Sequence, residues 1–194
     1  MKTISSLVLC CLTLLFLHAC SPANILATGG GSAMVIAEGD RSMGAVVDDA
    51  TIKVNIAAKF IGSEDNLFVN VSTTVLQGRV LLTGLVENQE IRIDAVRKVW
   101  EVNGVKEVIN EIQVGNRDSL KEYANDLWIN TQAKGLAAKA VGLRVVGYNF
   151  ETIQGKVYIA GITSRPKQLE DLINAVKTVK GVKEIVNYVI VKEK

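Results

Sequence analysis

The sequence predicts an α+β protein of two tandem α-β-β-α-β modules, each a three-stranded mixed sheet with two helices on one face. Three observations support this fold class. The stretch "GVKEVIN" that begins at Gly104 returns as "GVKEIVN" at Gly181, an offset of 77 residues (181 minus 104). Each copy holds two runs that alternate with period two, as in a half-buried hairpin, and two segments with helical apolar spacing. Two helices and three strands bury their apolar sides together when both helices cover the same face of one sheet.

The repeat continues along both copies without a gap. Identical residues at the same offset include the pairs Asp49/Asp126, Ile52/Ile129, Gly78/Gly155, Val80/Val157, Gly84/Gly161, Asp94/Asp171, Val99/Val176 and Val102/Val179. Agreement over this length indicates a duplicated module rather than chance. We therefore assign the first module to residues 48–115 and the second module to residues 117–194.

The first helix is expected at the start of each module. Its pattern is clearest in the second copy, where apolar residues recur at helical spacing at Ile129, Ala133, Leu136 and Ala140. Ser119 and Glu122 form a capping-box pattern just before this stripe, which is typical of a helix N-terminus. We expect the same helix in the first copy.

A hairpin, a second helix and a closing strand complete each module. The hairpin joins two extended runs at a Gln-Gly pair, in "NVSTTVLQGRVLLTGLV" and in "GYNFETIQGKVYIAGIT". The second helix has one buried face, which in the second copy comprises Leu169, Leu172, Ile173, Val176 and Val179. A glycine, Gly104 or Gly181, is expected to end that helix, and "VKEVINEIQV" or "VKEIVNYVIV" forms the last strand.

Residues 1–19 have the features of a secretory signal peptide. A positive start precedes an apolar stretch, residues 7–17, that is too short to span a bilayer as a stable helix. The tripeptide before Cys20 resembles a bacterial lipoprotein signal, in which the cysteine becomes lipidated and anchors the protein. Ser21 indicates the outer membrane, facing the periplasm, and residues 20–47 form a flexible, glycine-containing tether. The alternative is a plain secretory signal with an accidental cysteine.

The composition argues against an enzyme. His18 is the only histidine and lies in the signal peptide, so a mature chain of about 175 residues (194 minus 19) has no imidazole for nucleophilic catalysis. It also has no His/Cys cluster for zinc. Neighbouring acids such as Asp48-Asp49 are more typical of helix caps than of a catalytic pair. We expect no cofactor and no metal site.

The motifs of both copies resemble the BON domain, a small module of bacterial envelope proteins. The resemblance rests on "QGRVLLTGLV" and "VNGVKEVINEIQV", and on the lead-ins "RSMGAVVDDATI" and "NDLWINT". Two such domains behind a lipoprotein signal are similar to the DolP family of outer-membrane lipoproteins. That resemblance implies a binding protein whose second BON domain recognises anionic phospholipids, such as phosphatidylglycerol and cardiolipin, through its first helix. It also implies a role in outer-membrane integrity and at division sites.

The residues themselves favour lipid binding by the second module. Residues 48–115 carry seven Lys/Arg and ten Asp/Glu, whereas residues 117–194 carry thirteen and eight, which gives net charges of −3 and +5. On a helical wheel Trp128 lies outside the core stripe. We expect the phospholipid-binding residues to be Trp128, Lys121, Gln132, Lys134, Gly135 and Lys139. The alternative is that Trp128 packs at the edge of the core, although the first module has Thr51 at this position.

Ile93 and Trp100 give the first module an apolar edge that the second module lacks. They lie seven residues apart on the flank of the second helix, and their counterparts are Glu170 and Lys177. We expect this edge to contact the other module or a protein partner. A locally enlarged core is the alternative.

A second functional class remains open. The protein would then be a protein-interaction module for envelope or outer-membrane assembly machinery, without direct lipid recognition. Salt-sensitive binding to phosphatidylglycerol vesicles would distinguish the two classes. Nucleic acid is a weaker candidate, because export and the scarcity of aromatic residues argue against it.

Overall fold

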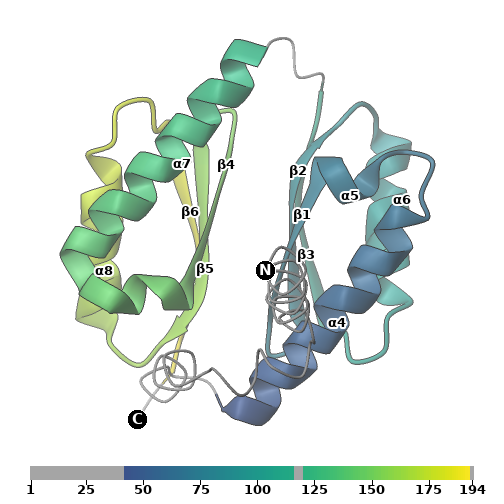
Figure 1. Ribbon diagram of the computed structural model, residues 1–194, viewed down its shortest axis with the longest axis horizontal. Helices are drawn as coiled ribbons and strands as arrows, with labels where there is room; N and C mark the ends of the chain where they lie inside the picture. Colours follow the sequence, from purple (N-terminus) through teal and green to yellow (C-terminus); the bar gives the residue numbers. More distant parts are fainter. Residues whose placement is uncertain (1–41, 116–119, 193–194) are drawn as a thin grey trace, which may run out of the picture. The chain divides into compact units, whose positions relative to one another are not determined.

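The computed structural model describes residues 42–115 and 120–192, which fall within one compact unit. The predicted signal peptide, Cys20 and Ser119 lie outside these residues, as does most of the predicted tether. The α-β-β-α-β order occurs twice, each time around a three-stranded mixed sheet, so the predicted fold class is confirmed (Figure 1).

Among the described residues, each module contains two long helices, one short helix and three strands. The first module comprises α4 (Met43–Ile61), α5 (Leu67–Asn70), β1 (Val71–Leu76), β2 (Arg79–Val86), α6 (Gln89–Trp100) and β3 (Glu107–Val114). The second comprises α7 (Leu120–Val141), the 3₁₀ helix η1 (Gly142–Gly147), β4 (Tyr148–Ile153), β5 (Lys156–Thr163), α8 (Pro166–Lys177) and β6 (Glu184–Val191). The apolar pattern does not predict α5 and η1, because one or two turns are too short to show a helical period.

α4 begins five residues before the predicted start of the first module. Ser42 caps it, because the Ser42 side chain accepts a hydrogen bond from the backbone N–H of Ala45 at 3.3 Å. Residues 43–47 are therefore helical. Their assignment to the tether is wrong, because this cap starts the helix upstream of the aligned repeat.

β2 and β5 are the central strands of the two sheets. β2 pairs antiparallel with β1 and parallel with β3, and β5 pairs in the same way with β4 and β6. α4 and α6 cover one face of the first sheet, and α7 and α8 cover the corresponding face of the second, as Figure 1 shows. Fully buried side chains fill the space between helices and sheet in both modules, among them Ile56, Leu82, Val99, Ile129, Ile159 and Leu172.

A buried aspartate of the first helix holds the hairpin turn in each module. Asp49 is 4% exposed and accepts hydrogen bonds from the backbone N–H groups of Gln77 and Gly78 at 2.8 and 2.9 Å. Asp126 does the same in the second module, at 2.7 and 2.8 Å. Gln77 and Gly78 both have positive φ, as a type I′ turn requires. The interpretation of Asp49 as a helix cap is wrong, because the residue lies inside α4 and fixes the turn instead.

The faces of the sheets that the helices leave uncovered pack against each other. One buried cluster at this sheet–sheet interface comprises Leu76, Leu81, Ala160 and Ile162, and another comprises Leu85, Ile153 and Tyr158. β2 and β5 are therefore buried on both faces, which explains why their sequences are almost continuously apolar. The half-buried hairpin pattern does not predict this pairing of the sheets.

Polar contacts from two tyrosines cross the sheet–sheet interface. Gln113 Nε2 donates a hydrogen bond to the Tyr158 hydroxyl at 3.2 Å, and the Tyr188 hydroxyl donates one to the Glu111 carboxylate. Burial raises the pKa of Tyr158. Burial and the hydrogen bond to Glu111 both raise the pKa of Tyr188. Tyr188 and Glu111 occupy equivalent positions of the repeat, so the corresponding strands β3 and β6 meet across this interface.

Candidate functional site

α7 presents one buried side to the rest of the second module. Ile129, Ala133 and Ala137 are fully buried, and Val141 is nearly so. The predicted stripe is wrong at its C-terminal end, where Ala140 is exposed. The buried residues from Ile129 to Val141 are four apart, and each step of four advances by about 40° around the helix. At the C-terminal end the buried side has therefore moved from the position of Ala140 to that of Val141. The buried side therefore turns toward η1 and β4, on which α7 packs.

The opposite side of α7 carries the predicted tryptophan. Trp128 is 47% exposed and lies about 160° around the helix from the middle of the buried side. Four further predicted residues are exposed on the same side, at i−7, i+4, i+7 and i+11: Lys121, Gln132, Gly135 and Lys139. The structure thus brings five of the six predicted lipid-site residues onto one surface, which we call the α7 face.

Lys134 is separate from the α7 face. It is exposed, but it lies about 120° around the helix from Trp128. It lines a cleft of about 420 Å³ together with Lys53 of α4, Phe68 of α5 and residues of β1 and β4. The sixth predicted residue is therefore not brought together with the other five.

Sequence reasoning missed several exposed apolar side chains of α7 and η1. Leu120, Tyr123 and Leu127 are exposed on α7 itself, and Leu143 and Val146 are exposed on η1. Their sequence signal is that they fall outside the apolar period of the core, which marks them as surface residues. The exposed surface of α7 and η1 is therefore more apolar than the predicted residues indicate.

The α7 face is positively charged and contains no acidic residue. Glu122 and Asp126, the acids of α7, lie within about 40° of the middle of the buried side. Among residues 42–115 and 120–192, no carboxylate lies within ion-pair distance of Lys121 or Lys139. These two ammonium groups are therefore available to an external anion.

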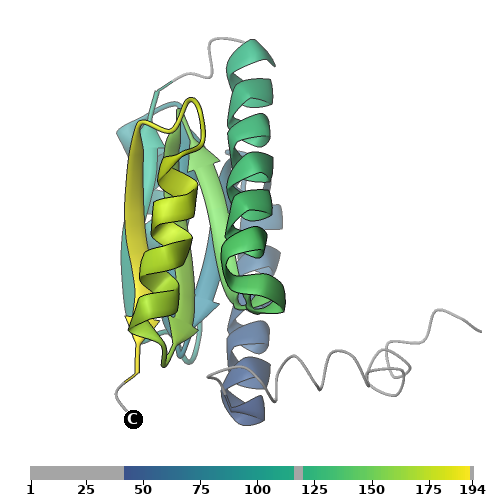
Figure 2. The same cartoon turned by 90° about the vertical axis from the view of Figure 1, so that its left-hand side faces the viewer.

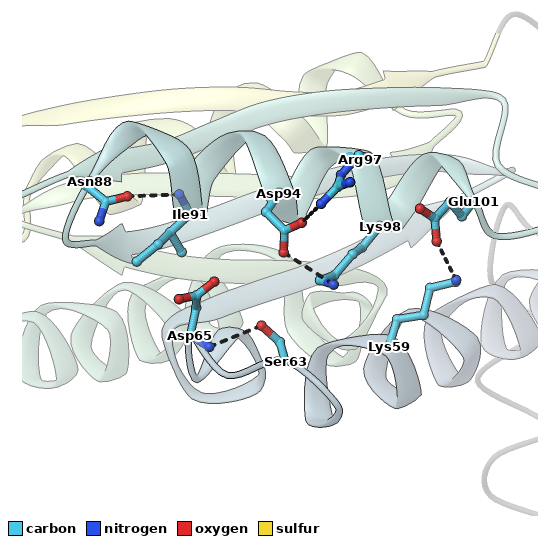
Figure 3. A network of polar contacts seen from close by, with 9 residues as sticks. All are labelled: Lys59, Ser63, Asp65, Asn88, Ile91, Asp94, Arg97, Lys98 and Glu101. Atoms are coloured by element: carbon cyan, nitrogen blue, oxygen red, sulfur yellow. Dashed lines mark hydrogen bonds and ion pairs between the residues drawn. The ribbon is translucent and has the colours of Figure 1, made fainter.

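Cations of the first module are more often engaged by carboxylates of the same module. Lys59 forms an ion pair with Glu101 at 2.7 Å, and Arg97 and Lys98 both contact Asp94 (Figure 3). Burial raises the pKa of Asp94, but hydrogen bonds from Arg97 and Lys98 outweigh this effect and lower that pKa. The hydrogen bond from Lys59 likewise lowers the pKa of Glu101. These internal pairs leave the first module with less positive charge for a ligand.

Ile93 and Trp100 lie on the outer side of α6 and remain exposed, at 58% and 52%. The two modules contact each other through their sheets, so this pair does not make the contact between them. The pair does not enlarge the core either. Contact with a protein partner stays a prediction.

The described part of the chain contains no group of three or more His, Cys, Asp or Glu side chains arranged to hold a metal ion. Within that same part, every helix is too short or too polar to cross a bilayer. The expectation that the whole protein needs no metal or cofactor stays a prediction.

Comparison with known proteins identifies the modules. A family model of the BON domain matches residues 48–116 and 125–193. The chain is 38% identical over 147 residues to an uncharacterized protein in the gshII 5′ region of Anaplasma centrale, covering 75% of this chain and 96% of that one. It is 29% identical over 182 residues to the outer membrane lipoprotein DolP of Haemophilus influenzae (90% and 91% covered). It is 30% identical over 149 residues to the osmotically-inducible protein Y of Escherichia coli (75% and 73% covered). With two BON domains that together span most of its length, the chain belongs to the BON-domain family, as a dual-BON protein of the DolP type.

Proposed function

We propose that the protein is anchored by a lipidated Cys20 to the periplasmic face of the outer membrane, where its second BON domain binds anionic phospholipids through the α7 face. The observation that carries this proposal is the half-exposed Trp128 between Lys121 and Lys139, on a surface without acidic side chains. Binding supports outer-membrane integrity, and the protein acts at division sites. The relative named as an outer membrane lipoprotein supports this location.

Each part of the α7 face has a distinct role at a membrane surface. The indole of Trp128 favours the level of the lipid headgroups, because the ring is apolar and its N–H is polar. The ammonium groups of Lys121 and Lys139 meet the phosphates, while their hydrocarbon stems lie along the apolar surface. A side chain added at Gly135 would meet nothing within 4 Å, so this position leaves open space on the face for a headgroup. Phosphatidylglycerol and cardiolipin supply the negative charge that this arrangement selects.

The proposed anchor makes a weak lipid site sufficient. Ser42 lies 22 positions after Cys20 (42 minus 20), and an extended chain of that length reaches at most about 75 Å. The second module is thereby held at a high effective concentration near the bilayer. Each lysine near an anionic surface then contributes about 1 kcal/mol.

The test is vesicle binding by the chain from residue 21 on, which keeps every described residue and lacks the acylated cysteine. Wild type is expected to bind vesicles that contain phosphatidylglycerol or cardiolipin, to bind phosphatidylcholine weakly, and to lose affinity as salt rises. Trp128→Ala is expected to weaken binding about tenfold. Trp100→Ala is the matched control, because it removes an equally exposed indole from α6, and it is expected to bind like wild type. Unchanged affinity of Trp128→Ala would refute the lipid site.

One observation favours a second candidate function, that of a protein-interaction module for envelope or outer-membrane assembly machinery. Ile93 and Trp100 are exposed together on α6, away from the α7 face. If the protein acts mainly by binding a protein partner through Ile93 and Trp100, Trp100→Ala in cells impairs the outer-membrane barrier to large antibiotics, while Trp128→Ala does not. The lipid-binding function predicts the reverse.

A further inference from the structure

α4 carries a line of apolar side chains on its outer side. We call Met43, Val47, Val54 and Ile61 the α4 stripe; their exposed fractions lie between 53% and 67%. With Ala50 and Ala57 they recur at alternating spacings of four and three residues. Such spacing places side chains along one narrow line of a helix.

The core of the first module does not use this line. The buried residues of α4 are Asp49, Ile52, Ile56 and Phe60, and the middle of the α4 stripe lies about 150° around the helix from them. Single exposed apolar residues are normal on a protein surface, but a continuous apolar patch marks a contact site. The α4 stripe is therefore a candidate contact site for a surface outside the fold.

α4 and α7 lie along the same edge of the paired sheets. Figures 1 and 2 both place α4 and α7 along one edge of the paired sheets, nearer the viewer in Figure 1 and to the right in Figure 2, with α6 and α8 toward the other edge. The two helices flank the same cleft, which Lys53 and Ala57 line from α4 and Lys134 lines from α7. A flat surface that lies along this edge therefore reaches both helices.

We propose that the α4 stripe is a second membrane contact, which inserts among the headgroups and upper acyl chains of the bilayer that the α7 face binds. The inference rests on the proposed function of the α7 face. The two helices divide the work chemically. α4 has Gly44 and Thr51 at the counterparts of Lys121 and Trp128, so it supplies apolar area where α7 supplies charge and an indole. Among the described helices and strands, α4 is also the nearest in sequence to the proposed anchor, because Ser42 caps its start.

A second copy of the chain is the less favoured occupant. Residues 43–61 span fewer than three heptads, whereas coiled coils are recognised by apolar seams over three to four heptads or more. A bilayer imposes no such length requirement. Phe68 of α5 is also exposed and lines the same cleft as Ala57 of α4, so apolar surface extends beyond the line of a coiled-coil seam.

The test is vesicle binding by the double variant Val47→Gln/Val54→Gln of the chain from residue 21 on. Glutamine forms helices at least as well as valine, so exposed substitutions at these positions keep the helix intact, which circular dichroism checks. We expect about tenfold weaker binding to phosphatidylglycerol vesicles. The loss persists at high salt, where the effect of Lys121→Gln/Lys139→Gln disappears, because salt screens charges and not apolar contacts. The matched control Ile93→Gln, on α6, leaves the affinity unchanged.

A fluorescent label gives an independent readout. The chain from residue 21 on has no cysteine, so Val54→Cys provides a unique site for an environment-sensitive fluorophore, and Ile93→Cys provides the control site. We expect vesicles to shift the emission of the label at position 54 to the blue and to leave that at position 93 unchanged.

The outcomes separate this inference from the function on which it rests. If Trp128→Ala weakens binding while Val47→Gln/Val54→Gln does not, the α4 contact is overturned and the α7 site stands. If the reverse holds, the α7 site is overturned and this inference falls with it, because α4 would then be the primary membrane contact and not a second one. A dimer in analytical ultracentrifugation that Val47→Gln/Val54→Gln abolishes would assign the α4 stripe to a second copy and would also overturn the inference.

Discussion

α4 and α7 are equivalent helices of a duplicated module, yet they agree on one side only. On the inner side, Asp49 and Asp126 bind their hairpin turns with the same pair of hydrogen bonds, and Ile52 and Ile129 occupy the same place in the core. On the outer side they differ. α4 has the uncharged residues Gly44 and Thr51 at the positions where α7 has Lys121 and Trp128. The difference teaches that the fold constrains the inner side of each helix and leaves the outer side free to acquire separate binding properties.

The physical reason is that substitutions on the inner side change the free energy of unfolding much more than substitutions on the outer side. Replacing a buried aspartate leaves backbone N–H groups of the turn without their partners, which costs several kcal/mol. Exposed substitutions usually change stability by less than about 0.5 kcal/mol. Thr51 and Trp128 therefore coexist at equivalent positions without a cost to either module.

The largest expected effect tests the inner side. Asp49→Ala and Asp126→Ala each remove two hydrogen bonds to a charged acceptor, so each is expected to lower the free energy of unfolding by about 3 kcal/mol, measured by urea denaturation. Asp48→Ala is the matched control, because the neighbouring carboxylate is exposed, and it is expected to change stability by less than about 0.5 kcal/mol. Clearly unequal losses for Asp49→Ala and Asp126→Ala would break the equivalence of the two inner sides.

The next effect concerns the sheet–sheet interface, where both tyrosines, Tyr158 and Tyr188, come from the second module. An unfolded tyrosine loses its proton near pH 10, whereas in the folded protein the pKa of each is raised. Their contribution to stability is therefore fully present below about pH 10 and is lost as pH rises through the folded pKa. The expected loss is up to about 1.4 kcal/mol per pH unit for each tyrosine that stays neutral when folded.

The measurement is urea denaturation at pH 9 and pH 11 for wild type and for Tyr158→Phe/Tyr188→Phe. The double variant removes these two titrating groups and keeps the other ionisable groups, so its stability is expected to fall less steeply over this range. Equal slopes for the two proteins would show that the tyrosines ionise alike in the folded and unfolded states.

A smaller effect tests the charge on the outer side of α7. Lys121→Gln and Lys139→Gln each remove about 1 kcal/mol of attraction to an anionic surface, which corresponds to roughly fivefold weaker vesicle binding at low salt. Lys177→Gln makes the same change in net charge on α8 and is expected to leave the affinity nearly unchanged. An equal loss for all three variants would mean that net charge acts without a localised site.

The smallest expected effect is a transfer of the α7 chemistry to α4. Gly44→Lys and Thr51→Trp place an ammonium group and an indole at the positions equivalent to Lys121 and Trp128. In a chain that also carries Trp128→Ala, they are expected to restore vesicle affinity by two- to threefold, because α4 and α7 lie along one edge of the paired sheets. Restoration that fails in a folded variant would show that equivalent positions of the two helices do not meet the same bilayer.

Much of the fold follows from local patterns in the sequence. The repeat at 77 residues, the Gln-Gly turns and the apolar periods predict the order of the elements and the mixed sheet, because these signals depend on backbone geometry over a few residues. The start of α4 is missed because it depends on a single cap, Ser42, outside the repeat. Five of the six predicted lipid-site residues share a surface because helical spacing fixes their direction, whereas Lys134 falls on a different flank of the same helix.

By itself the sequence determined that this protein is a tandem of two α-β-β-α-β modules and that Trp128 lies outside the core of its helix. Only the tertiary structure decided which faces remain for binding. The sheets bury their second faces against each other, so Tyr158 is enclosed while Ile93, Trp100 and the α4 stripe stay exposed. Periodicity predicts which side chains point away from the core of their own module. Whether another part of the chain then covers them depends on contacts between residues far apart in sequence.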